Sequence, residues 1–143
     1  MYEIETDDAP ASLGPYSQGI VDRDTVYVSG QGPVDPESGD VVSEDIEAQT
    51  ERVLENIAAV LEAAESSLDD VVKSTVFVRD MRYYDEINEV YGEYMTVPYP
   101  ARSAVEVDDL PIDIGVEIEV VASLNSGYTV CRKSLCNRGP DSA

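Results

Sequence analysis

The feature that most constrains the fold is an alternation of β-branched runs with two amphipathic helical segments. An apolar stripe at helical spacing predicts a helix over about 44–65, with Ser43 as its expected N-cap. A second stripe predicts a helix over about 83–95, which Pro98 and Pro100 end. Strands are predicted at 18–21, 25–30, 71–78, 102–107 and 115–124. The resulting order β-β-α-β-α-β-β is typical of an α+β domain, with both helices on one face of a mixed sheet.

The predicted strands contain more apolar residues than two helices on one face are expected to cover. We expect the other face of the sheet to be apolar as well, and to need cover that the chain itself does not supply. This pattern therefore predicts an oligomer in which sheets pack together. The residues concerned are Val76, Val78, Val105, Val107, Val116, Ile118 and Val120.

The chain carries 30 acidic and nine basic residues, a net charge of −21. The acids are scattered along the chain, which favours adaptation of the whole surface to high salt over a dedicated cationic partner or mimicry of nucleic acid. At molar salt the Debye length is only about 3 Å, so self-repulsion of this charge is weak. The absence of a Lys/Arg cluster argues against binding to a nucleic-acid backbone.

The sequence also indicates where the protein works and how far its domain extends. No apolar run reaches the length of a membrane span, and the N-terminus lacks a signal-peptide pattern, so we expect no membrane partner and a cytoplasmic location. We expect one domain over 1–125. Residues 126–143 hold three of the nine basic residues and both cysteines, Cys131 and Cys136, and are interpreted as a tail of unknown role.

The chain has no histidine. This excludes Ser-His-Asp and Cys-His triads and argues against a zinc or non-haem iron site, so we expect no metal. A general base must then be Glu, Asp or Tyr. Ser17 and Ser103 have no histidine partner, which makes a serine nucleophile a poor hypothesis.

Two segments suggest a small site that binds an anion and moves protons. Arg102 starts one apolar run, and a planar guanidinium matches a carboxylate. Glu117 and Glu119 lie inside another apolar run, where a partly buried carboxylate is a candidate for proton transfer. The plainer alternatives are that Arg102 pairs with a surface acid and that one or both glutamates belong to a wet face. Residues 117 and 119 have the same parity, so both can point the same way.

Four pieces of the sequence together resemble the Rid (YjgF-like) family, in particular its RidA branch of enamine/imine deaminases. They are Gly14-Pro15-Tyr16-Ser17-Gln18-Gly19, Val28-Ser29-Gly30-Gln31, the run 73–80, and Pro100-Ala101-Arg102-Ser103 with Val116-Glu117-Ile118-Glu119. The resemblance covers about residues 3–125. It implies a chorismate-mutase-like α+β fold and a homotrimer with a barrel-like centre and active sites between subunits. It also implies hydrolysis of 2-imino and 2-enamino acids, such as 2-iminobutanoate and 2-iminopropanoate, to 2-keto acids and ammonia without a cofactor.

The resemblance further implies roles for individual residues. Arg102 would bind the substrate carboxylate, Glu117 would position or activate the attacking water, and Tyr16 would line the pocket. Backbone at Ser29 and Gly30 would approach the ligand. A helix asparagine, Asn88, would lie near the site.

One position departs from the family pattern, and two other functions stay open. Ala104 stands where many members have a cysteine, so no reactive thiol is expected in the cleft. The first alternative is an endoribonuclease that inhibits translation, which the acidic charge disfavours. The second is a non-catalytic trimer that binds small keto acids or acts as a holdase.

Overall fold

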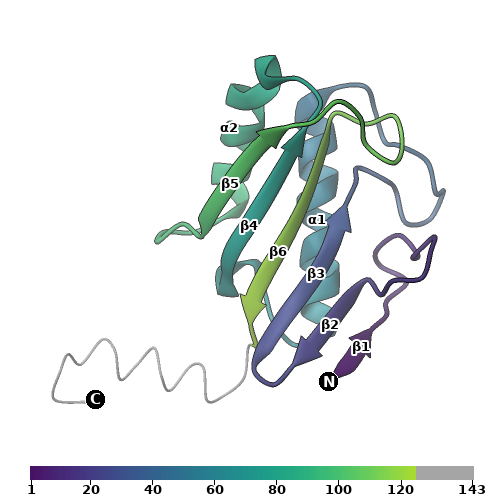
Figure 1. The fold of residues 1–143 in the computed structure, drawn as a ribbon, viewed down its shortest axis with the longest axis vertical. Coiled ribbons are helices and arrows are strands. Elements are labelled where there is room, and N and C mark those ends of the chain that lie inside the picture. The colour runs from purple at the N-terminus through teal and green to yellow at the C-terminus, as the bar shows by residue number, and fades with distance from the viewer. Residues whose placement is uncertain (125–143) are drawn as a thin grey trace, which may run out of the picture.

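A computed structural model describes residues 1–124, which form one six-stranded sheet with both long helices on the same face (Figure 1). The strand order is β1-β2-β3-β6-β4-β5, and β4 and β5 are the parallel pair in an otherwise antiparallel sheet. The predicted mixed α+β sheet is thereby confirmed. Its elements are β1 Tyr2–Ile4, β2 Gly19–Asp22, β3 Thr25–Gln31, α1 Ile46–Ala63, β4 Val71–Val78, α2 Tyr84–Tyr94, β5 Ala101–Glu106 and β6 Val116–Ser123, with short 3-10 turns at Leu68–Asp70 and Met81–Tyr83.

Helix α1 begins two residues later than predicted, and its N-cap is Asp45 rather than Ser43. The Asp45 carboxylate accepts a hydrogen bond from the backbone N–H of Ala48 at 3.0 Å. The Ser43 hydroxyl instead accepts from the N–H of Asp45 at 2.9 Å, one step outside the helix. Serine and aspartate are both favoured as N-caps, but only Asp45 lies directly before the first helical residue, where its side chain reaches a free N–H of the first turn.

The interpretation of the apolar strand residues as an uncovered face is wrong. Five of the seven point toward the helices and are buried by the chain's own core: Val76, Val78, Val116, Ile118 and Val120. Because side chains alternate across a strand, these same-parity residues share the covered face. Val105 lies on the opposite face with 41% of its surface exposed, and Val107 follows the end of β5.

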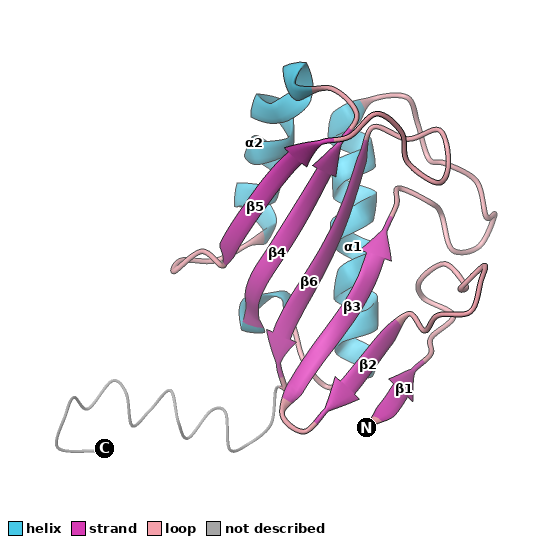
Figure 2. Cartoon of the chain, in the orientation of Figure 1, coloured by secondary structure: helices cyan, strands magenta, loops and turns pink. Residues whose placement is uncertain are grey.

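The face turned away from the helices is mixed in character. Within residues 1–124 no helix lies over it (Figure 2), and it carries Tyr27, Lys73, Thr75, Phe77, Glu117 and Glu119. The apolar pattern therefore does not by itself require a second layer.

Strand β1 is the element that the sequence did not predict. Its three residues pair antiparallel with β2, Glu3 opposite Ile20. A run this short shows too little alternation to stand out. The tail over 126–143 with Cys131 and Cys136 lies outside the described residues. Neither α1 nor α2 has the length and apolar character needed to cross a membrane.

Candidate active site

Arg102 lies on the edge strand β5 and points to the face that α2 covers. Its Nη2 donates hydrogen bonds to the Tyr84 hydroxyl at 2.9 Å and to Asn88 Oδ1 at 2.7 Å. The guanidinium carbon lies 4.8 Å from the centre of the Tyr91 ring and 5.5 Å from that of Tyr84. Within residues 1–124 Arg102 forms no ion pair, so the alternative of a surface acid as partner is wrong for that part of the chain.

One helix face supplies all three neighbours of Arg102. Tyr84, Asn88 and Tyr91 recur at intervals of four and three residues, which places them in a row on one side of α2. The Tyr91 hydroxyl shares a 2.6 Å hydrogen bond with the Ser74 hydroxyl, and both groups are buried. Ser74 is in register with Arg102 on the adjacent parallel strand. We call Arg102, Asn88, Tyr84 and Tyr91 the arginine cluster.

The tyrosines of α2 do more than pack the helix against the sheet. Tyr84 and Tyr91 contact the arginine, and Tyr94 donates to Glu55 at 2.9 Å. Burial and then the bond to Glu55 raise the pKa of Tyr94 to about 12. Tyr84, Asn88 and Tyr91 follow an i, i+4, i+7 spacing, and this pattern could have identified both tyrosines as neighbours of Asn88 on one helix face.

Glu117 points to the opposite face of the sheet, where it is half-buried against the backbone of Gly30. A Cβ added at Gly30 would lie 2.9 Å from Glu117 Cδ and closer still to its Oε2. Burial, together with the charge of Glu119, raises the pKa of Glu117. Glu119 points to the same side but is exposed, as the shared parity allowed. Glycine at position 30 therefore makes room for a carboxylate of the same chain.

The hydroxyl of Ser29 is used to fix a loop. It donates to the backbone carbonyl of Ser17 at 2.6 Å, while the N–H of Ser29 donates to the carbonyl of Gln18 at 3.0 Å. These two bonds attach the segment before β2 to the irregular end of β3, where the register with β6 shifts. We call Ser29, Gly30 and Glu117 the glutamate cluster.

Tyr16 precedes Ser17 in the loop that Ser29 fixes, and within residues 1–124 no hydrogen bond joins it to Glu117 or Arg102. Its side chain is 52% exposed, and its hydroxyl accepts from the N–H of Leu13 at 3.3 Å. Its phenol is thus open to solvent or to a second molecule.

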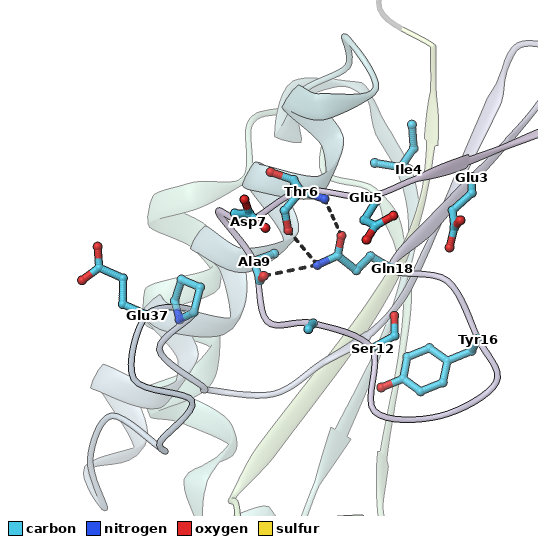
Figure 3. A pocket seen from close by; sticks show the side chains of 12 residues that line it. Glu3, Ile4, Glu5, Thr6, Asp7, Ala9, Ser12, Tyr16, Gln18 and Glu37 are labelled. Carbon is cyan, nitrogen blue, oxygen red and sulfur yellow. Dashed lines mark hydrogen bonds between the residues drawn. The ribbon is translucent and has the colours of Figure 1, made fainter.

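A separate hollow of about 480 Å³ lies between β1 and the loops that follow it, and Tyr16 is part of its wall (Figure 3). The Gln18 side chain lines the hollow and forms hydrogen bonds to the backbone of Thr6 and to the carbonyl of Ala9. The lining residues include four carboxylates, those of Glu3, Glu5, Asp7 and Glu37, and none of the lining residues is basic. Such a wall repels an anionic substrate, and the hollow contains none of the predicted site residues except Tyr16.

The arginine and glutamate clusters do not meet within one chain. Arg102 on β5 is in register with Ser74 on β4, and Ser74 is in register with Val120 on β6. Glu117 lies three residues from Val120 on β6, which is two strands away from β5. Standard strand spacings make this separation roughly 10 Å along the strands and roughly 10 Å across them. The two side chains also leave opposite faces of the sheet. A small ligand therefore cannot touch both groups of the same chain.

The described residues offer no group of three or more His, Cys, Asp or Glu side chains arranged to hold a metal ion. The polar groups available to a ligand are thus a guanidinium among aromatic rings and a half-buried carboxylate with a raised pKa. This pair can bind an anion and exchange a proton.

Comparison with known proteins identifies the family. Residues 6–124 match the family model described as Endoribonuclease L-PSP. A RutC family protein of Saccharolobus solfataricus is 53% identical over 119 residues, covering 83% of this chain and 94% of that protein. The 2-iminobutanoate/2-iminopropanoate deaminase of Salmonella typhimurium is 46% identical over 122 residues, covering 83% and 94%.

A solved structure agrees with these matches. Escherichia coli TdcF with bound serine superposes with a TM-score of 0.82 at 41% identity, covering 86% of this chain and 98% of that one. The family match covers most of the chain, and the relatives exceed 40% identity over nearly their whole length. The chain belongs to the Endoribonuclease L-PSP family, also known as the Rid (YjgF-like) family.

Proposed function

We propose that this protein hydrolyses 2-imino and 2-enamino acids, such as 2-iminobutanoate, to 2-keto acids and ammonia. The observation that carries the proposal is a half-buried arginine without a carboxylate partner among residues 1–124, in a chain with 30 acids. A cation kept free amid such an excess of acids is available to an external anion. The Salmonella relative named as this deaminase and the serine bound to TdcF, itself a small carboxylate, support the same assignment.

The proposed reaction uses two groups. Arg102 binds the substrate carboxylate, and Glu117 holds the attacking water. Because burial raises its pKa, the Glu117 carboxylate is a stronger base than an exposed glutamate and can accept a proton as water adds to the imine carbon. That proton passes to the nitrogen, and the resulting carbinolamine loses ammonia to leave the keto acid. Tyr16, with its exposed hydroxyl, is proposed to line the same site.

We further propose that the site forms between two copies of the chain, in a homotrimer. The support is geometric, since Arg102 and Glu117 leave opposite faces of one sheet, too far apart for a single imino acid. In a ring of three or more copies each interface joins two different surfaces, so the arginine cluster of one copy can face the glutamate cluster of the next. Both helices of the described part of the chain lie on the other side of the sheet, so neither of them covers the face that carries Glu117 (Figure 2).

The test is release of ammonia and keto acid from 2-iminobutanoate generated in situ by a threonine dehydratase at molar salt. Wild type should exceed the spontaneous rate, and Arg102→Ala should fall to that rate. The matched control is Arg82→Ala, which also removes one guanidinium but from a side chain that is 84% exposed and pairs with Asp80. Equal activity of Arg102→Ala and Arg82→Ala would refute the anchor role.

The two other functions are separated by companion measurements. The family description names an endoribonuclease, but no cluster of free basic side chains exists in residues 1–124, where Arg52, Arg79 and Arg82 already pair with acids. Cleavage of RNA by protein that is inactive on imines would favour that function. Keto-acid binding by wild type without any turnover would favour the non-catalytic trimer.

A further inference from the structure

The arginine cluster contains the Tyr84 hydroxyl, which accepts a hydrogen bond from Arg102 Nη2. We propose that Tyr84 is a positioning residue: with Asn88 and the ring of Tyr91 it holds Arg102 so that Nη1 and Nε stay available to the substrate carboxylate. This inference rests on the proposed function, because it concerns the group that receives the carboxylate.

The hydrogen bonds of Arg102 support this role. A guanidinium has five N–H groups in one plane, two of them on Nη2. Both bonds that Arg102 makes within residues 1–124 come from Nη2, one to Tyr84 and one to Asn88. Two acceptors at one nitrogen fix the rotation of the group within its plane. The three hydrogens on Nη1 and Nε are thereby left for a ligand.

Motion out of the plane is limited by Tyr91. Its ring lies 4.8 Å from the guanidinium carbon, within the range of a cation–π contact. The ring is itself fixed, because its hydroxyl bonds to Ser74 at 2.6 Å in the buried core. Ser74 lies on β4 in register with Arg102, so the strand next to Arg102 also holds the Tyr91 ring in place.

Removing the Tyr84 hydroxyl should weaken substrate binding. One Nη2 hydrogen would lose its acceptor, and the long arginine side chain would sample more orientations before the ligand arrives. Ordering that side chain then becomes part of binding, which lowers affinity. The ring of Tyr84 stays in Tyr84→Phe, so packing on α2 is kept. We expect KM to rise about five- to tenfold while kcat changes by less than about twofold, since the lost interaction supports binding before and during reaction alike.

The experiment compares Tyr84→Phe with Tyr83→Phe. The control removes the same hydroxyl from the adjacent residue, which is exposed and makes no hydrogen bond to Arg102. Two readouts are taken at the same molar salt: kcat and KM with 2-iminobutanoate generated in situ, and binding of 2-oxobutanoate, the corresponding keto acid, by calorimetry. Thermal melting of each variant checks the fold.

We expect Tyr84→Phe to raise both KM and the Kd for 2-oxobutanoate, and Tyr83→Phe to match wild type. A Tyr84→Phe protein with wild-type KM and Kd overturns the inference. So does a wild type that does not bind 2-oxobutanoate, because Arg102 would then receive no carboxylate. A third result separates the two proposals: wild type binds 2-oxobutanoate, Tyr84→Phe weakens that binding, and neither protein turns over the imine. The positioning role of Tyr84 would then stand, and the proposed deaminase activity would be refuted.

Discussion

Replacing Gly30 by alanine should disable the protein without destabilising it. The new Cβ would lie 2.9 Å from Glu117 Cδ, whereas carbon atoms in contact are normally about 3.5–4.0 Å apart. The carboxylate must therefore move by about 0.6–1.1 Å. A displacement of about 1 Å at a catalytic group can cost roughly 10²-fold in rate. We expect kcat to fall by about that factor and KM to change little, because Arg102 lies on the other face.

The folding stability of Gly30→Ala should not fall together with its activity. The atoms that must move are the free end of a side chain, which can rotate away, and the backbone at Gly30 does not have a positive φ. Alanine inside a strand is favoured over glycine by roughly 0.5–1 kcal/mol. The melting temperature should therefore stay the same or rise slightly.

The assay measures kcat and KM on 2-iminobutanoate for Gly30→Ala, with Gly92→Ala as the control. A Cβ at Gly92 meets only the Tyr99 hydroxyl at 3.9 Å, an ordinary contact. The same Gly30 substitution is also made in a Glu117→Ala background, where it should cause no further loss. Unchanged kcat in Gly30→Ala, or an equal loss in both backgrounds, would refute the idea that Gly30 acts by making room for Glu117.

Three further predictions concern charge. Glu119→Gln should shift the acidic limb of the pH–rate profile to lower pH, because one of the two causes that raise the pKa of Glu117 is removed; an unmoved limb contradicts a role for Glu119. Glu117→Gln should be more stable than wild type at neutral pH, and the difference in stability should shrink in acid. Because the folded state raises the pKa of Glu117, wild type keeps its full stability below the ordinary value of 4.5 and loses part of it as the pH rises through the folded-state pKa. Melting curves of both proteins between pH 4 and 8 check this, and a constant difference would argue against it. Dialysis from molar salt to dilute buffer should reduce the far-UV circular dichroism signal, because the Debye length grows from about 3 to about 30 Å and the charge of −21 is no longer screened; an unchanged spectrum would count against adaptation to salt.

The elements were predictable from sequence because each carries a local periodicity. Strand β4 was predicted at its observed bounds, and α1 and α2 within two residues at each end. The N-cap was missed because Ser43 and Asp45 are both good caps, and only backbone geometry decides between them. Strand β1 was missed because three residues are too few to show a period.

The candidate residues were predictable, but their arrangement was not. Sequence shows that residues 117 and 119 share a face, yet it does not show whether Arg102 lies on that face or on the opposite one. That depends on the pairing of β5 with β4 and of β4 with β6, which are contacts between distant parts of the chain. The same pairings explain why five residues that were interpreted as an uncovered face lie in the core: Val76, Val78, Val116, Ile118 and Val120.

Mixing two variants that each lack one residue of the proposed deaminase site tests whether that site is shared between copies. Arg102→Ala and Glu117→Ala are unfolded together in equal amounts, refolded at molar salt and assayed on 2-iminobutanoate, with each variant refolded alone as the control. If Arg102 of one copy works with Glu117 of the next, about a quarter of the interfaces in randomly mixed rings carry both native residues, and about a quarter of wild-type activity should return. Mixed oligomers with no more activity than either variant alone would contradict the shared site.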